Sequence, residues 1–119
     1  MLNLAQISKA MESLKEWGLE GNTILKDSEF PSFRSAAEFV GKIGELSEKH
    51  NHSPTILIEN RTVKLILTTK EERGLTEKDF SLAEAIDNIG KTEETSIKEN
   101  NQEIHKTEKK INEKLKEDL

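Results

Sequence analysis

The chain has 119 residues and contains no cysteine. This absence excludes disulfide bonds, a thiolate metal site and a thiol nucleophile. The chain also lacks any apolar stretch near the roughly 20 residues that a membrane-spanning helix needs. Its N-terminus has no basic region followed by a continuous apolar run, as a secretory signal would have. We therefore expect no membrane association and, by default, a cytoplasmic location.

Basic residues are also fewer than acidic residues. The 18 Lys and Arg residues are outnumbered by 23 Asp and Glu residues, which gives a net charge of -5. This balance disfavours a surface for direct nucleic-acid binding. Hydrophobic residues make up only 33% of the chain, and the segment 91–119 is almost entirely polar. Length and composition thus predict one domain over residues 1–90 and a charged, helical or disordered tail over 91–119.

The tail contains three isoleucines seven residues apart, at Ile97, Ile104 and Ile111. The other core-type positions of this heptad are polar, at Asn101 and Glu108. A stable coiled coil needs both positions apolar over several heptads, and isolated polar helices are only marginally stable. Two interpretations stay open: a solvated or fraying helical tail, and a weak self-association helix.

The first half of the chain predicts two amphipathic helices separated by a short β-hairpin. Apolar residues recur at helical spacing from Leu4 to Trp17, which predicts the first helix. The β-prone segment 22–26 and the segment 28–30 are expected to pair across a turn. The second helix is predicted to begin after its N-cap Ser32 and to end near residues 49–51.

The second half predicts another hairpin and a third helix. The β-branched runs 55–58 and 62–69 are joined by residues 59–61, which are typical of a turn. Thr76 is a strong N-cap for the third helix, and Asp79 stands at the capping-box position. In the second run, alternate residues are expected to face a helix layer; these are Val63, Leu65, Leu67 and Thr69. The order α-β-β-α-β-β-α predicts an α+β fold, a four-stranded antiparallel sheet with helices packed on one face.

Three short segments carry a more specific signal. They are His52-Ser53-Pro54 before the second hairpin, Thr68-Thr69-Lys70 after it, and Gly74-Leu75-Thr76-x-x-Asp79 at the start of the third helix. With Trp17 and Phe33-x-x-Ala36, this layout resembles the pterin-4a-carbinolamine dehydratase family over about residues 4–90. In that family the pattern is approximately His-His-Pro, two strands, and Thr-His-x-x-x-Gly-Leu-Thr-x-x-Asp.

The chain departs from the family pattern at two of its three histidines. His52 matches the first histidine, whereas Ser53 stands in place of the second and Lys70 in place of the third. The resemblance implies removal of water from a 4a-hydroxytetrahydropterin, which gives a quinonoid dihydropterin. Such a reaction needs a base and an acid, and imidazole suits both tasks because its unperturbed pKa is about 6.5.

The resemblance also implies roles for individual residues. His52 and Lys70 would be catalytic: Lys70 would polarise or protonate the leaving hydroxyl but would be a poor base. Contacts with the pterin would come from His50, Ser53, Thr69 and Asp79. The chemistry requires no metal and no cofactor, and the His50-x-His52 pair has no third ligand with convincing spacing.

Ordinary structural roles compete with these assignments. His50 and His52 are also typical of a helix C-terminus, where a partly charged imidazole is favourable. Lys70 would then be a solvated residue at a strand end, and Asp79 a helix cap.

Three functions therefore remain open. The first is a dehydratase, weakened by its missing histidines, that acts on a small pterin as a homodimer or homotetramer. The second is a catalytically inactive binding module of the same fold that serves as a dimerisation or assembly cofactor, as some proteins of this fold do. The third is a pterin-binding or orphan protein that retains the cleft without turnover.

Overall fold

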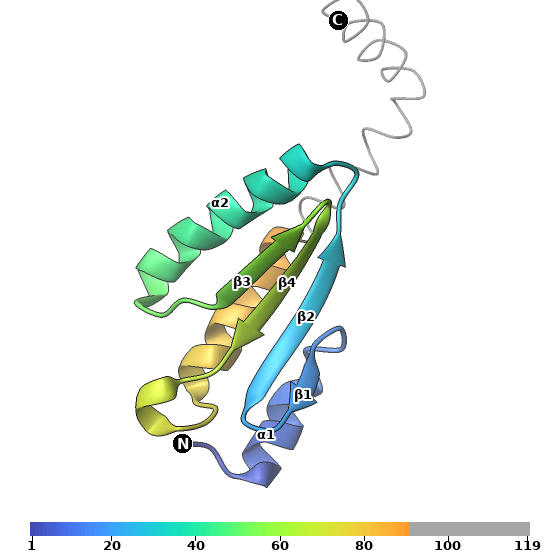
Figure 1. Ribbon diagram of the computed structural model, residues 1–119. Coiled ribbons are helices and arrows are strands. Elements are labelled where there is room, and N and C mark those ends of the chain that lie inside the picture. The colour runs from blue at the N-terminus through green and yellow to red at the C-terminus, as the bar shows by residue number, and fades with distance from the viewer. Residues whose placement is uncertain (91–119) are drawn as a thin grey trace, which may run out of the picture. The chain divides into compact units, whose positions relative to one another are not determined.

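The computed structural model describes residues 1–90 (Figure 1), and the predicted tail lies outside the described residues. Residues Met1–Ile86 form one compact unit. No helix among the described residues is long and apolar enough to cross a membrane. The elements follow in the order α1 (Leu4–Met11), β1 (Gly18–Glu20), β2 (Thr23–Glu29), α2 (Phe33–His50), β3 (Thr55–Glu59), β4 (Thr62–Leu67), a 3₁₀ turn (Lys70–Glu72) and a helix over 77–90.

The four strands form one antiparallel sheet in the order β1-β2-β4-β3. The α+β class and the element order predicted from the sequence are thus confirmed. The β3–β4 hairpin turns at Asn60, which adopts a left-handed φ of 54°. Its register pairs Thr55 with Ile66, so the beginning of β3 lies beside the end of β4. This pairing brings the two segments that flank the hairpin to the same end of the sheet.

One face of the sheet is covered by helices, and Figure 1 shows α1 and the helix over 77–90 behind it. The alternation predicted for β4 is confirmed, because Val63, Leu65 and Leu67 are each 0% exposed while their neighbours are half-exposed. The helices contribute the opposing apolar side chains, which are Ala36, Phe39 and Ile43 of α2 and Leu82, Ala83 and Ile86 of the last helix.

The N-terminal region differs from the prediction. The first helix ends at Met11, and Leu14 and Trp17 are reached through turns in which their N–H groups bond to Met11 and Leu14 carbonyls. The first hairpin also lies earlier than expected, with its turn near Gly21 at a φ of 61°. A spacing of three residues fits successive turns as well as a helix, so the apolar pattern alone predicted too long a helix.

The ends of α2 determine where its neighbours lie. The Ser32 hydroxyl accepts the Ser35 N–H at 3.1 Å, as predicted for an N-cap. At the other end Asn51 adopts a left-handed φ of 50°. The His52 N–H then donates back to the Ser47 carbonyl at 3.1 Å. This bond closes the helix and sets the position of His52 on the backbone.

Candidate functional site

An open cleft of about 380 Å³ lies at the end of the sheet where β3 begins and β4 ends. Its walls come from three parts of the chain that are distant in sequence. The end of α2 contributes Glu48, the link into β3 contributes His52 and Ser53, and the 3₁₀ turn after β4 contributes Lys70 and Glu71. The antiparallel pairing of β3 with β4 is what brings these segments together.

The cleft brings together some of the residues predicted from the sequence. His52, Ser53 and Lys70 line it, as expected for residues at adjacent strand ends. His50 is half-buried at the end of α2 and does not line the cleft. The roles proposed for these four residues stay predictions.

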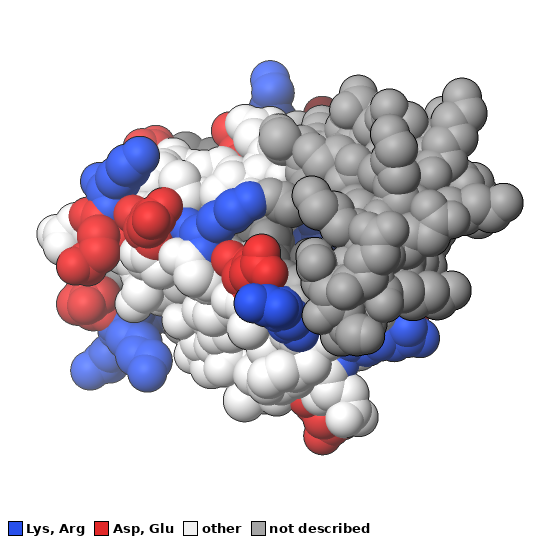
Figure 2. Space-filling view, turned by 90° about the horizontal axis from the view of Figure 1, so that it is seen from above, with Lys and Arg blue, Asp and Glu red and all other residues white. Residues whose placement is uncertain are grey.

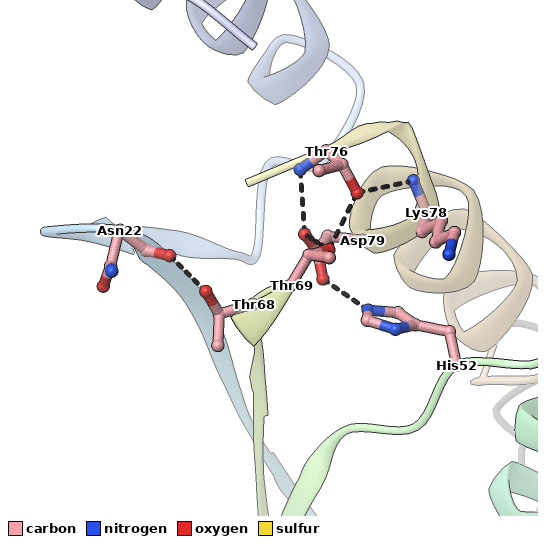
Figure 3. Close-up of polar contacts among 7 residues, drawn as sticks. All are labelled: Asn22, His52, Thr68, Thr69, Thr76, Lys78 and Asp79. Carbon is pink, nitrogen blue, oxygen red and sulfur yellow. Dashed lines mark hydrogen bonds and ion pairs between the residues drawn. The ribbon is translucent and has the colours of Figure 1, made fainter. Parts of the chain in front are cut away.

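Asp79 lies behind His52, away from the cleft. Its side chain is 0% exposed, and its Oδ1 lies 2.6 Å from Nε2 of His52, whose side chain is 10% exposed. Figure 3 shows the imidazole between Asp79 and the chain that leads into β3, with its second nitrogen, Nδ1, directed away from the carboxylate. Asp79 therefore contacts the imidazole directly.

The second carboxylate oxygen of Asp79 is held by two donors. Its Oδ2 accepts the Thr76 N–H at 2.9 Å, which is the capping-box bond predicted from the sequence. The same oxygen accepts the hydroxyl of Thr69, which is 2% exposed, at 2.8 Å. We refer to Asp79, His52, Thr69 and Thr76 as the Asp79 network.

Two carboxylates in the cleft were not predicted from the sequence. Glu48 precedes His52 by four residues on the last turns of α2, and Glu71 follows Lys70 directly. Their proximity in sequence to residues already singled out was the only available signal. With Lys70 they give the cleft one cationic and two acidic side chains, so a ligand with several N–H donors would find matching acceptors.

Charged side chains of both signs occur on one face of the described domain. Figure 2 shows basic and acidic side chains interspersed on the described part of one face, with no continuous patch of a single sign there. Residues 1–90 also contain no group of three His, Asp or Glu side chains arranged to hold a metal ion.

The fold agrees with comparisons to known proteins. The family model described as "Pterin 4 alpha carbinolamine dehydratase" matches residues 1–89. The chain belongs to this dehydratase family. A relative from Roseiflexus sp. (strain RS-1), named "Putative pterin-4-alpha-carbinolamine dehydratase", is 44% identical over 88 residues, which are 74% of this chain and 95% of the relative. A relative of the same name from Trichormus variabilis is 38% identical over 89 residues, 75% of this chain and 96% of the relative.

A solved structure extends the comparison to three dimensions. The crystal structure of a "transcriptional coactivator/pterin dehydratase" from Brucella melitensis superposes with a TM-score of 0.71 at 27% identity. The match covers 74% of this chain and 96% of that chain. The match to the dehydratase family therefore covers residues 1–89, and the tail lies beyond the matched residues.

Proposed function

We propose that this protein is a 4a-hydroxytetrahydropterin dehydratase that eliminates water to give a quinonoid dihydropterin. Membership of the dehydratase family supports the substrate class. The observation that carries the proposal is the 2.6 Å contact between His52, on the cleft wall, and the buried carboxylate of Asp79. A carboxylate that accepts one imidazole N–H leaves the other ring nitrogen as a proton acceptor, as a general base requires.

In the proposed reaction His52 acts as the base. Its Nδ1 removes the proton from a ring nitrogen of the substrate, and the electron pair left behind forms the C=N double bond as the C4a–O bond breaks. The hydroxide departs with a second proton as water. Asp79 stabilises the imidazolium formed in this step, because its carboxylate accepts the Nε2–H throughout.

Lys70 is proposed to act on the leaving group. It lines the same cleft from the 3₁₀ turn, and its ammonium group donates to the departing hydroxyl. Ser53 is proposed to donate a hydrogen bond to the pterin from the adjacent wall. His50 does not line the cleft, and we assign it no step in the reaction.

Glu48 is proposed to bind the pterin. The pyrimidine edge of a pterin presents an amino group and a ring N–H, which are donors. A carboxylate accepts such a pair of donors in parallel. Because Glu48 lines the cleft on the side of α2, this contact would place the ring system across the floor between α2 and the 3₁₀ turn.

We also propose that the domain self-associates through its sheet. The face away from the helices carries Ile66, and the edge strand β3 exposes Leu57 and Ile58 at 55% and 37%. An edge strand with exposed apolar side chains offers both unpaired backbone groups and apolar area to a second copy.

The decisive test is a dehydratase assay with a 4a-hydroxytetrahydropterin generated in situ. We expect the full-length protein to exceed spontaneous dehydration. Loss of the base should cost His52→Ala about 10²- to 10⁴-fold in rate. His50→Ala is the matched control, since it removes an imidazole two residues away that does not line the cleft.

Two outcomes would contradict the proposal. One is a wild-type rate no higher than the spontaneous rate, and the other is a His52→Ala rate equal to that of the wild type. If the wild type is no faster than the spontaneous reaction, the binding-module function becomes the better account, in keeping with the word coactivator in the name of the Brucella melitensis protein. If His52→Ala is as fast as an active wild type, His52 is not the base.

A further inference from the structure

We infer that Thr69, Thr76 and Asp79 determine which nitrogen of His52 carries the proton, and so hold Nδ1 as the proton acceptor in the cleft. Thr69 and Thr76 are then positioning residues that act through Asp79 on His52. The inference about the tautomer rests on the geometry of the Asp79 network alone. Its consequence for turnover rests on the proposed function.

The first step concerns the proton on Thr69. Its Oγ1 lies 2.8 Å from Asp79 Oδ2 and 2.7 Å from Thr76 Oγ1, but a hydroxyl has only one hydrogen to donate. An ionised carboxylate cannot donate, so the Thr69 hydrogen points to Asp79. The hydrogen between the two threonines must then come from Thr76.

The second step concerns the hydrogen-bond donors beyond Thr69. The Thr76 hydroxyl donates to Thr69, and its oxygen accepts the Lys78 N–H at 3.2 Å. Both threonine hydroxyls therefore donate toward Asp79, and Figure 3 shows the contacts that link them. The Lys78 N–H can only donate, and its bond to the Thr76 oxygen is compatible with this direction. The direction itself is fixed by the ionised carboxylate of Asp79, which only accepts.

The third step concerns the two oxygens of Asp79. Oδ2 faces two donors, the Thr76 N–H and the Thr69 hydroxyl, and therefore carries no proton itself. The only proton shared with His52 lies between Oδ1 and Nε2, 2.6 Å apart. Because the ionised carboxylate of Asp79 only accepts, Nε2 is the donor across this contact and carries the proton.

The fourth step concerns the opposite side of the ring. Among the described residues no protein group forms a hydrogen bond with Nδ1 of His52. With Nε2 protonated, neutral His52 presents a lone pair at Nδ1. The Asp79 network thus selects the proton-accepting form of His52 before any substrate is bound.

The network predicts an unusual effect for Asp79→Asn. The amide oxygen must occupy the Oδ2 position, because the Thr76 N–H that points there can only donate. The amide NH₂ then faces Nε2 of His52 and requires it to accept. The proton moves to Nδ1, and the base is lost from the cleft although shape and hydrogen-bond number hardly change.

The tautomer is read directly from the imidazole ¹⁵N shifts in long-range ¹H–¹⁵N spectra of the full-length protein, recorded at the alkaline end of a titration. The His52 signals are assigned by their absence in His52→Gln. We expect protonated Nε2 in the wild type and protonated Nδ1 in Asp79→Asn. A wild-type imidazole protonated at Nδ1, or the same tautomer in both proteins, would overturn the inference.

A second pair of variants keeps the test valid if Asp79→Asn does not fold. Thr69→Val removes one donor to Asp79, and Thr69→Ser retains it. We expect the His52 ¹⁵N signals to shift or broaden in Thr69→Val and to stay at the wild-type position in Thr69→Ser. Unchanged signals in Thr69→Val would exclude a positioning role for Thr69.

Activity provides an independent comparison. A wrong tautomer of a catalytic histidine costs about 10⁴-fold in kcat elsewhere, and we expect a loss of this order in Asp79→Asn with little change in KM. Thr69→Val should lower kcat about tenfold, as loss of one hydrogen bond to a charged group does, and Thr69→Ser should restore it. If the spectra show the expected tautomers but the wild type has no turnover, the proposed function fails and the inference about His52 stands.

Discussion

His52 Nε2 lies 2.6 Å from Asp79 Oδ1, although 27 residues separate them in the sequence. His52 is held by the turn that ends α2, and Asp79 by the first turn of the helix over 77–90. The contact therefore depends on how two helices pack against the same sheet. The position of the imidazole in the cleft is thus a property of the whole domain.

Restoring the missing imidazoles should raise activity. We expect the double variant Ser53→His and Lys70→His to dehydrate a 4a-hydroxytetrahydropterin faster than the wild type, since both positions already line the cleft. One added acid or base is typically worth about 10²- to 10⁴-fold. If the double variant folds but is as inactive as His52→Ala, the cleft is not a dehydratase site.

The left-handed residue Arg73 offers a stabilising substitution. Its φ of 57° is unfavourable for a residue with a Cβ, and glycine adopts it freely. We expect Arg73→Gly to raise the free energy of unfolding by about 0.5–1 kcal/mol after the greater freedom of glycine in the unfolded chain is included. Denaturant unfolding measures this gain. Arg73→Ala is the control, because it removes the same side chain but keeps the Cβ, and an equal gain there would refute the strain argument.

The two faces of β4 should differ in their sensitivity to truncation. Leu65 is 0% exposed and faces the helices, so Leu65→Ala should cost about 2–5 kcal/mol of stability. The neighbouring Lys64 is half-exposed on the other face, and Lys64→Ala should stay within about 0.5 kcal/mol of the wild type. Similar losses in the two variants would mean that both faces of the sheet are covered.

Self-association through the sheet predicts a mass above that of the monomer at tens of micromolar, measured by light scattering. Leu57→Lys places a charge on the exposed edge strand opposite Lys64 and should shift the full chain toward monomer. Leu4→Lys, on α1 and 78% exposed, is the control that should leave the mass unchanged. A monomeric wild type would defeat the proposal, and equal dissociation by both variants would place the interface elsewhere.

The fold was largely predictable from the sequence because its signals are local. The alternation in β4 and the caps at Ser32 and Thr76 each need only a few neighbouring residues, and the structure bears them out. The predicted extension of the first helix to Trp17 was wrong, since a buried side chain at that spacing can also follow a turn.

The site was predictable only in part. His52, Ser53 and Lys70 could be placed at one end of the sheet, because antiparallel pairing brings adjacent strand ends together. The cleft-facing position of Glu48 depends on the rotation of α2 about its axis, which packing determines. The bond between Asp79 and His52 depends on two helices at once, so no local pattern indicates it.

Asp79 caps a helix and also orients an imidazole with the same carboxylate. A catalytically inactive chain of the same fold would still need the aspartate to begin its last helix. An intact Gly-Leu-Thr-x-x-Asp segment consequently indicates that the last helix can begin correctly. Its presence alone does not indicate catalytic activity. Active and inactive proteins of this fold are better distinguished at Ser53 and Lys70, which line the cleft and do not cap a helix as Asp79 does.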